Sequence, residues 1–440
     1  MISLPYSKNK RYLSGIDWFL CGLDHSLKAL TGSGNLFSVA LELEGFCDAG
    51  PLKENLEKYF AGYPLLAGKP SRCWNLAPYW KIPKNPCISW GFKQHQLDEG
   101  LSFDRTLEAL SLGVNTAFSR DDEHVRVSLF TLRQKSYLVF VFDHRLFDAR
   151  GAEMFIAGLQ AHFEGKPVTA AQPREPAHLD RWADKFLAGQ RVNRFFIKFR
   201  QKGRASGFDL PRLVGARRSR FKVLSLSLEE TDRVIKNADA RAGYLLLMPF
   251  ALAASIRSTA RLFAKQGISR THCLVPVTID TRSRAKVGKE MFFNHASFMF
   301  FGFEAGDIKD FSGLIAKASR QFYDMVQSGL SRDIKDAAML MRIAPLRFLA
   351  RFLKLSLNEQ TASLAFSYNG DGVYAEKEFF GHKVLNLMHL PRVPVPPGLG
   401  IFFTRFGGRL NLVVSYLDGL VDDADVAVLA EDIKKELLQG

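Results

Sequence analysis

Cysteine is scarce in this sequence. The five cysteines are scattered over 440 residues, form no C-x-x-C pair and leave an odd one over. This usage argues against a disulfide framework and against a cysteine-based zinc site, and it is typical of a reducing compartment. Four of the histidines do not fall at spacings that suggest a metal site: His272, His295, His382 and His389. We therefore expect no bound metal.

Long apolar runs and targeting segments are also lacking. No window of about 18 residues is uninterruptedly apolar, so no transmembrane helix is predicted. The first 20 residues lack the basic-then-apolar order of a secretory signal. We expect a cytoplasmic protein, with peripheral contact to an anionic membrane as an alternative. No P-loop and no G-x-G-x-x-G turn is present, so nucleotide hydrolysis and dinucleotide-dependent redox chemistry have no motif to support them.

Positive charge, in contrast, is abundant. The chain has 60 lysines and arginines against 45 acids, a formal net charge of +15. Ten of the basic residues lie between positions 191 and 220, beside a single acid, Asp209. This stretch is interpreted as a basic helix followed by a linker, and its charge predicts attraction to phosphates, acidic proteins or anionic lipid without choosing among them. Nucleic-acid binding is not expected, because no recognition motif accompanies the charge.

Strand-like and helix-like patterns follow one another in a mixed order, without a long βαβ series. We expect an α/β (α+β) protein of two lobes, with mixed, largely antiparallel sheets flanked by helices. The predicted N-terminal lobe is 1–190, the basic linker 191–220 and the C-terminal lobe 221–440. The main predicted strands are 35–45, a hairpin over 124–143, 271–280, 295–304, 362–370 and a hairpin over 400–417. The main predicted helices are 48–66, 151–165, 242–267, 308–328, 335–356 and a C-terminal helix.

The segment YLVFVFDHRLFDARGAEMF, residues 137–155, carries the clearest chemical signal. An alternating apolar strand ends on His144, Asp148 follows four residues later, and a helical pattern resumes at once. A neutral imidazole at a strand end can act as a general base toward a hydroxyl or an amine. In the alternative interpretation, His144 is a structural strand end and Asp148 caps the next helix. The string alone does not choose between these interpretations.

This loop resembles the H-x-x-x-D-G motif of the CoA-dependent acyltransferase superfamily, which includes chloramphenicol acetyltransferase, peptide-synthetase condensation domains and wax ester synthase/diacylglycerol acyltransferases. Softer similarities extend over most of the chain. They include LSGIDWFL near the start, YFAGYPLLAG, LVPVTIDTRSR followed by FNHASFMFF, and SYNGDG with the segment after it. The resemblance implies two chloramphenicol acetyltransferase-like lobes with an active-site tunnel between them.

The resemblance also implies an activity: an acyl group moves from a CoA or carrier-protein thioester to a hydroxyl or amine acceptor, in lipid or secondary metabolism. His144 would be the general base, and Asp148 would form a structural salt bridge. Arg282 is the expected partner of Asp148, with Arg284 behind it. No bound cofactor is implied, because acyl-CoA or acyl-phosphopantetheine serves as co-substrate.

The resemblance further implies that Asn294, Ser367 and Tyr368 line the tunnel and bind substrate. From the residues alone, each can equally be part of a turn: Asn294 enters a strand, and SYNGDG is a good turn sequence. Helix-like residues 345–357 place Arg347, Arg351 and Lys354 on one face, which suits either an anionic bilayer or an ordinary solvated surface.

Three positions depart from the family pattern. Asp143 stands where condensation domains have a second histidine, Ala149 replaces the glycine after the aspartate, and Ala67 replaces an arginine. These departures keep the base but leave an alternative open. In that alternative the chain is a non-catalytic, condensation-like protein that binds a carrier protein or a membrane surface.

Overall fold

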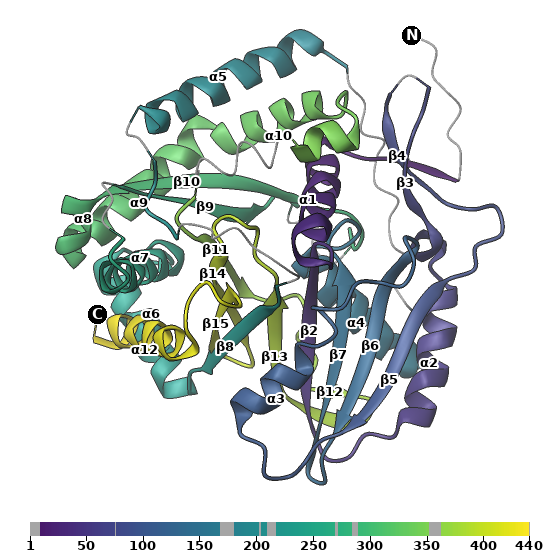
Figure 1. The fold of residues 1–440 in the computed structure, drawn as a ribbon. Coiled ribbons are helices and arrows are strands. Elements are labelled where there is room, and N and C mark those ends of the chain that lie inside the picture. Colours follow the sequence, from purple (N-terminus) through teal and green to yellow (C-terminus); the bar gives the residue numbers. More distant parts are fainter. Residues whose placement is uncertain are drawn as a thin grey trace.

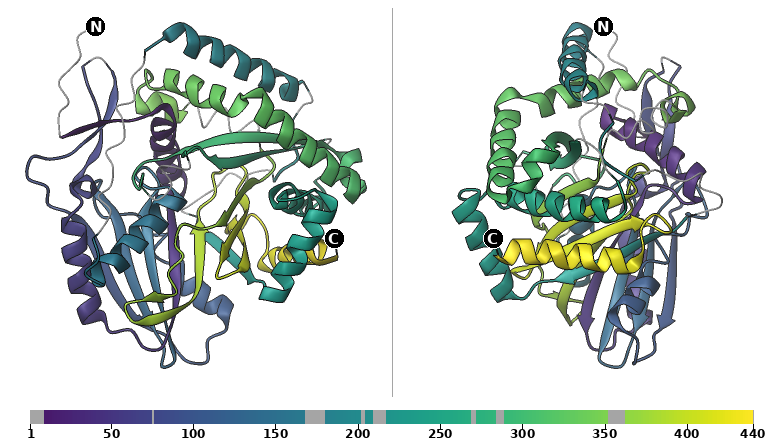
Figure 2. Two further views of the ribbon diagram at one scale, coloured as in Figure 1. Left: turned by 180° about the vertical axis from the view of Figure 1, so that it is seen from behind. Right: turned by 60° about the vertical axis from the view of Figure 1, so that its left-hand side comes forward.

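The structure is a computed structural model, and it describes residues 9–74, 76–167, 180–201, 204–208, 217–268, 272–283, 289–351 and 362–439. These residues form two lobes, each built on a six-stranded sheet, and a small three-stranded sheet beside them (Figure 1). Figure 2 shows the two large sheets next to each other in the middle of the molecule, with helices on their outer sides.

The sheet of the N-terminal lobe leads to the His144 loop. Its order is β12-β13-β2-β7-β6-β5, and all of its pairs are antiparallel except β5 with β6. Alternate residues of β2 face opposite cores, as the pleat requires. Val39 packs with the helices α2 and α4, whereas Ala40 packs on the side of α3. The elements are β2 (Leu36–Glu44), β5 (Ser89–Gln96), β6 (Glu123–Thr131), β7 (Lys135–Asp143), β12 (Glu378–Phe379), β13 (His382–Pro391), α2 (Ala49–Ala61), α3 (Phe103–Leu110) and α4 (Ala149–Phe163).

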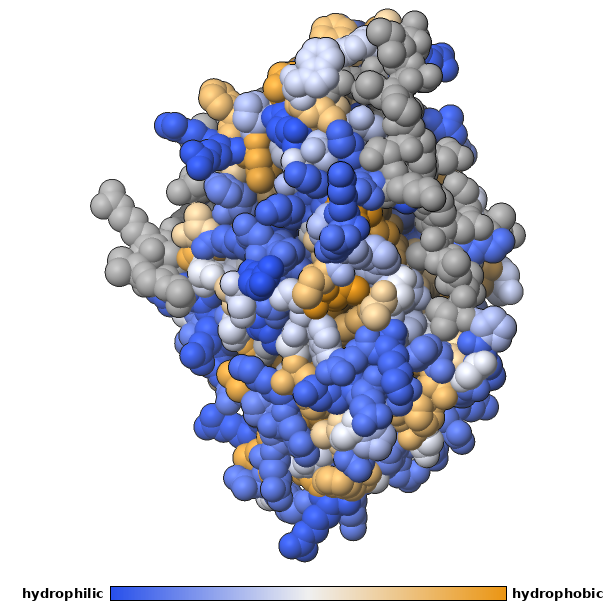
Figure 3. Space-filling model, turned by 90° about the vertical axis from the view of Figure 1, so that its right-hand side faces the viewer, coloured by the Kyte–Doolittle hydropathy of each residue, from blue (hydrophilic) through white to orange (hydrophobic). Residues whose placement is uncertain are grey.

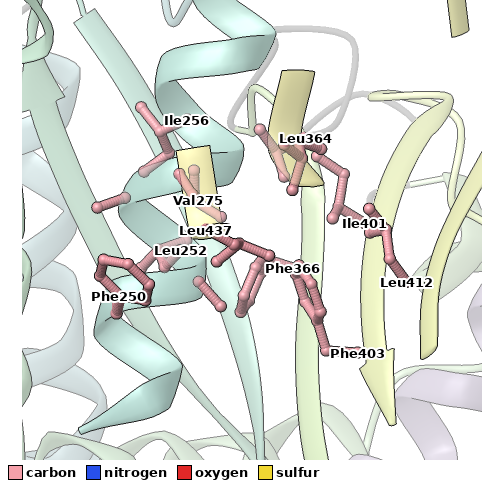
Figure 4. Packing of buried hydrophobic residues seen from close by; sticks show 14 of the residues in the cluster. Phe250, Leu252, Ile256, Val275, Leu364, Phe366, Ile401, Phe403, Leu412 and Leu437 are labelled. Carbon is pink, nitrogen blue, oxygen red and sulfur yellow. The ribbon is translucent and has the colours of Figure 1, made fainter. Parts of the chain in front are cut away.

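The sheet of the C-terminal lobe has the order β10-β9-β11-β14-β15-β8, and β11 runs parallel to both of its neighbours. Figure 4 shows its core, in which Phe250 of α7 and Leu437 of α12 meet Phe366 of β11 and Ile401 of β14. The elements are β8 (Ser219–Ser225), β9 (His272–Asp280), β10 (Ala296–Glu304), β11 (Ala365–Asp371), β14 (Leu399–Phe406), β15 (Arg409–Leu417), α6 (Leu228–Arg241), α7 (Leu247–Lys265), α8 (Ala305–Lys309), α9 (Phe311–Ser328) and α12 (Asp423–Gln439).

The remaining elements lie around the ends of these sheets. Helix α5 packs on α10 at the top of Figure 1, and α10 packs on α1. The small sheet has the order β1-β4-β3. These elements are α1 (Gly15–Thr31), α5 (Trp182–Arg200), α10 (Leu330–Met341), β1 (Lys10–Tyr12), β3 (Lys69–Arg72), β4 (Pro78–Lys81) and the 3-10 helix η1 (Pro64–Ala67).

The lobes do not follow the predicted chain boundaries. β12 and β13 come from the predicted C-terminal lobe, 221–440, yet β13 pairs with β2 over Phe37 to Leu43. The boundary at residue 190 falls inside α5. The predicted linker, 191–220, begins in the second half of that helix and ends in β8. Long-range strand pairing of this kind leaves no local signal in a sequence.

Two sheet faces join the lobes. Met388 and Leu390 of β13 pack with Val413 of β15 and Phe221 of β8 in one buried cluster. Beside this cluster, an amide ladder that includes the buried Asn386 and Asn411 crosses the same junction. The Ser225 hydroxyl donates to Asn411 Oδ1 at 2.6 Å, and Asn411 Nδ2 donates to Asn386 Oδ1 at 3.0 Å.

The predicted helix 335–356 is wrong in its bounds. Gly329 has a left-handed φ of 68°, which ends α9 and lets α10 start at once. α10 then ends at Met341, and a new helical turn begins only after Pro345, a residue that disfavours helix in the residue before it. Lys354 lies outside the described residues. In the described turn, Leu349 is buried, whereas Arg347 and Arg351 are exposed.

In the described parts of the chain, no helix combines the length and the apolar character that a bilayer crossing requires. Figure 3 shows the face that carries α2 and β5, where small groups of apolar side chains lie among polar ones. Among the described residues visible on this face, the apolar side chains form no broad patch.

The amide ladder yields a prediction about stability. Asn411→Ala should lower the free energy of unfolding by about 1–3 kcal/mol, because Ser225 and Asn386 lose their buried partner. Urea denaturation measures this change. The exposed Asn193→Ala on α5 is the matched control and should stay within about 0.5 kcal/mol of the wild type. An equal effect of both substitutions would contradict the inference.

Candidate active site

His144 lies immediately beyond the C-terminal end of β7, between the two lobes. Its backbone N–H donates to the Asn35 carbonyl at 3.0 Å, which extends the pairing of β7 with β2. Its ring meets the Phe37 ring edge-on, with 5.0 Å between ring centroids. The residue is only partly buried, unlike its neighbours Asp143 and Arg145. The strand end thus presents an oriented imidazole that is accessible from outside.

Asn294 holds this imidazole from the other lobe. Asn294 Nδ2 donates to the His144 carbonyl at 2.9 Å, and Asn294 Oδ1 lies 3.0 Å from His144 Nδ1. A carbonyl only accepts, so the amide NH₂ must face it and the amide oxygen must face the ring. Nδ1 therefore carries the proton, and in the neutral ring the lone pair is on Nε2.

Asp17 in turn holds the backbone at Asn294. Asp17 Oδ1 accepts from the Asn294 N–H at 3.0 Å, and Asp17 Oδ2 accepts from the Ser14 N–H and hydroxyl at 2.8 and 2.7 Å. Ser14 and Asp17 form the capping box of α1. Asp17 is fully buried and Asn294 is 1% exposed. The start of α1 thus fixes the residue that orients the imidazole.

Asp148 makes the main polar contact between the lobes at this site. As the N-cap of α4, its Oδ1 accepts from the Gly151 N–H at 2.8 Å. The same oxygen accepts from Arg282 Nη2 at 2.8 Å, and Oδ2 accepts from the His295 N–H at 3.0 Å. The structure thus brings the two predicted residues Asp148 and Arg282 together, with the Arg282 side chain only 1% exposed.

The charge state of Asp148 follows from these contacts. Burial by itself raises the pKa of the carboxyl group, but Arg282 and the His295 N–H outweigh this effect and hold the pKa below its usual range. Asp148 is therefore ionised and occupied on both oxygens. It fixes the loop and does not touch the His144 ring.

Asp143 forms a second buried ion cluster behind the loop. Arg145 Nε donates to both carboxylate oxygens of Asp143, and Arg145 Nη2 donates to Asp143 Oδ2 at 2.7 Å. His124 of β6 places Nδ1 2.7 Å from Asp143 Oδ2 and Nε2 2.7 Å from the Gly68 carbonyl. Burial raises the pKa of Asp143, but Arg145 and His124 reverse this and hold it well below its usual value.

The role of His124 was not predicted, although the sequence carries a signal for it. The predicted hairpin runs from residue 124 to residue 143, and in an antiparallel hairpin the first residue faces the last. A histidine and an aspartate at these ends therefore meet. Asp143, which departs from the family pattern, is thus part of a buried ion cluster. This substitution leaves the His144 ring in place.

The departure at Ala149 also has a local explanation. Ala149 is the first residue of α4, a position that needs no glycine. The close backbone approach falls at Gly151, where an added Cβ would lie 2.1 Å from the Met291 carbonyl. Ala67, the third departure, is buried at the end of η1, directly before the glycine that contacts His124.

Of the residues predicted to bind substrate, Asn294 is the one that hydrogen-bonds to His144 within the described part of the chain. Both ends of the Asn294 amide are engaged by His144, so this side chain orients the base. The Ser367 hydroxyl donates to Asn369 Oδ1 at 3.0 Å. Burial raises the pKa of Tyr368 to about 12. Within the described residues no hydrogen bond joins Ser367 or Tyr368 to His144, and their role in binding stays a prediction.

Some of the basic residues of the predicted stretch 191–220 form ion pairs with acids of the same chain. Arg191 of α5 pairs with Asp333 of α10 at 2.5 Å. Arg220 lies 2.6 Å from Glu108 and 2.8 Å from Asp423. The predicted site residue Arg284 lies outside the described residues, as does Asp209. Within the part of the chain that is described, no cluster of three metal-ligating side chains occurs.

Comparison with known proteins gives a structural result. No protein-family model and no curated protein matches the sequence. A trichothecene 15-O-acetyltransferase from Fusarium sporotrichioides superposes with a TM-score of 0.69 and 16% identity, over 98% of this chain and 94% of that one. The first condensation domain of the calcium-dependent antibiotic synthetase, in complex with a substrate analogue, gives 0.69 and 16% identity over 98% and 96%.

A third solved structure extends the comparison. The epimerization domain of the third module of tyrocidine synthetase B gives a TM-score of 0.62 and 14% identity, over 98% of this chain and 95% of that one. These neighbours are an acetyltransferase, a condensation domain and an epimerization domain that share this fold. The predicted two-lobed fold with mixed sheets is therefore confirmed over almost the whole chain. At this level of identity the likeness establishes the fold and not the activity.

The buried pair Asp148–Arg282 predicts a pH dependence. The pKa of Asp148 is lower in the folded than in the unfolded chain, so its stabilisation is present above about pH 4 and is lost as the pH falls further. Asp148→Asn should cost about 3 kcal/mol at pH 7 and flatten the loss of stability in acid.

Denaturant unfolding between pH 3 and pH 7 measures this difference. Asp98→Asn, at an exposed carboxylate, is the matched control and should behave as the wild type. A loss of stability for Asp148→Asn that is the same at pH 3 and pH 7 would contradict the ionised pair.

The Asn294 contacts predict the tautomer of His144. In ¹⁵N-labelled protein at pH 8, His144 should carry its proton on Nδ1, whereas a free imidazole favours Nε2. Asn294→Leu should shift the population toward the Nε2 proton, because the acceptor at Nδ1 is gone. The ring nitrogen chemical shifts report this directly. A wild-type ring protonated on Nε2 would contradict the assignment.

Proposed function

We propose that the chain is an acyltransferase that moves an acyl group from a CoA or carrier-protein thioester to a hydroxyl or amine acceptor, with His144 as the general base. One observation carries the proposal. The Asn294 amide donates to the backbone carbonyl of His144 and accepts from its ring Nδ1–H, so that Nε2 keeps its lone pair at a partly open strand end between the lobes. A purely structural histidine does not need its second nitrogen free.

The proposed reaction balances in protons without a cofactor. Nε2 of His144 takes the proton of the acceptor as the acceptor oxygen or nitrogen attacks the thioester carbonyl. The tetrahedral intermediate then collapses, the carbon–sulfur bond breaks, and the imidazolium returns the proton to the leaving thiolate. The acyl group passes directly from one substrate to the other, so no acyl-enzyme is formed.

Asn294 and Asp148 support the base in different ways. Asn294 Oδ1 accepts a hydrogen bond from Nδ1–H of His144, whether the ring is neutral or charged, and it adds no negative charge beside the ring. Asp148 is directed away from the ring, toward Arg282 and the His295 N–H, and keeps the two lobes in register. Because the Asn294 amide is fully engaged, we assign it a positioning role in place of the predicted substrate binding.

The fold alone does not decide the reaction. Solved structures with this fold include an acetyltransferase, a condensation domain and an epimerization domain. The non-catalytic alternative, binding of a carrier protein or a membrane surface, is compatible with the same fold. The catalytic and the non-catalytic function differ in whether His144 acts on a substrate. The proposal includes an acceptor from lipid or secondary metabolism and a cytoplasmic location.

A turnover assay tests the proposal. Purified protein is mixed with acetyl-CoA, a long-chain acyl-CoA or an acylated carrier domain, together with hydroxyl- or amine-bearing acceptors, and acceptor-dependent thiol release is followed. His144→Gln should lower the rate by about 10²- to 10⁴-fold, because the general base is lost. His25→Ala, at an exposed histidine of α1, is the control and should retain the wild-type rate.

Two outcomes contradict the proposal. One is a His144→Gln variant that is as active as the wild type. The other is a wild-type protein that binds the carrier domain but releases no thiol with any donor, which supports the non-catalytic alternative. Circular dichroism of His144→Gln establishes that a lost rate does not reflect unfolding.

A further inference from the structure

A large groove opens between the lobes, away from the His144 loop. It has a volume of about 960 Å³ and is lined by β8, β13, the turn between β14 and β15, and the segment that follows β11. On β2, Leu43 faces the Val384 end of β13, whereas Leu36 faces Asp143. These two positions are seven residues apart, which is ~23 Å along a strand. The far rim of the groove is thus well removed from the base.

The walls of the groove are largely apolar. They are formed from both lobes and include the aromatic ring of Phe406, which is stacked on the ring of Tyr374 with 6.3 Å between centroids and 29° between the ring planes. The principal apolar residues of the wall are Phe103, Leu224, Leu228, Val384, Leu385 and Phe406. Leu228 is 51% exposed and Phe103 is 40% exposed. Such exposure of large apolar side chains in a concave site is a feature of ligand binding.

Hydrogen bonds keep the groove open. At its base, Ser225 and Asn386 belong to the amide ladder that joins β8, β13 and β15. Behind the wall segment that contains Tyr374, the buried carboxylate of Glu153 accepts hydrogen bonds from the N–H groups of Val373 and Tyr374, and it also lies 2.7 Å from His389 Nε2. The groove is therefore preformed and does not require the lobes to move.

The rim carries positive charge that is not engaged in an ion pair with any described residue. Lys377, Lys383 and Arg409 line the groove, are exposed, and have no ion pair with any residue that the structure describes. The two acids of the lining are already paired: Asp371 with Arg405, and Glu42 with Lys135 at 3.1 Å. An apolar trough with three unpaired cations at its edge is complementary to a molecule with a long apolar chain and an anionic head.

We propose that this inter-lobe groove binds an amphiphilic anion, a long alkyl or acyl chain that ends in a phosphate or carboxylate. The chain lies along Leu224, Val384 and Leu385, and the head contacts Lys377, Lys383 and Arg409. The proposal goes beyond acyl transfer, because the head lies too far from His144 to be its reacting group. It depends on the groove alone and not on the activity of His144.

Binding of dodecyl phosphate below its critical micelle concentration tests the proposal. Isothermal titration of the full-length protein should show one site. Lys383→Glu with Arg409→Glu should weaken binding by at least about tenfold, since the charge at the rim is reversed. Leu385→Trp should also weaken it by filling the trough. Lys93→Glu with Arg133→Glu, which changes the net charge equally at exposed positions elsewhere, is the matched control.

The ligand controls separate the two parts of the site. Inorganic phosphate lacks the chain and dodecyl maltoside lacks the charge, so both should bind at least about tenfold more weakly than dodecyl phosphate. Equal binding of either compound, absence of dodecyl phosphate binding, or equal loss in both double variants would overturn the proposal. His144→Gln should bind as the wild type, so that failure here and failure of the acyltransferase proposal are distinguishable.

Discussion

One buried carboxylate organises the site. Asp148 ends the N-terminal lobe's loop, caps α4, and accepts from Arg282 and from the His295 N–H of the opposite lobe. Because His295 follows Asn294 in the chain, the same contact places the Asn294 amide against His144. An unpaired carboxylate in this position would carry the full cost of burial, so the pairing of the lobes and the placement of the base depend on one another. The H-x-x-x-D spacing thus places the proposed base, His144, four residues before Asp148, whose contacts with the opposite lobe position it.

Much of the fold was predictable from local patterns. The hairpin that ends at Asp143, the capping box of Ser227 and Glu230, and β9 and β10 follow strand and helix periodicity and cap chemistry. The pairing of β13 with β2 was not predictable, because these strands are more than 300 residues apart and no short-range pattern encodes their register. The break between α10 and the next helical turn was missed because its apolar spacing continues past Pro345.

The site was predictable in part. His144 and Asp148 stand out because polar residues end an otherwise apolar strand. Arg282 and Asn294 were singled out by resemblance, but the role of Asn294 depends on the direction of its amide, which only three-dimensional contacts reveal. Asp17 gave no signal as a functional residue, since a capping box explains it completely at the level of sequence. Its carboxylate serves both the helix and the segment that holds the base.

The central claim is that His144 acts as a base in direct transfer between two substrates. A single-turnover experiment with a radiolabelled acyl thioester and excess acceptor, quenched on the millisecond scale, tests it most directly. Direct transfer with His144 as the base predicts that label leaves the thioester and enters the product at the same rate, that none is attached to the protein, and that His144→Gln abolishes both processes. Label that appears on the protein before the product, or an unchanged rate in His144→Gln, would contradict it.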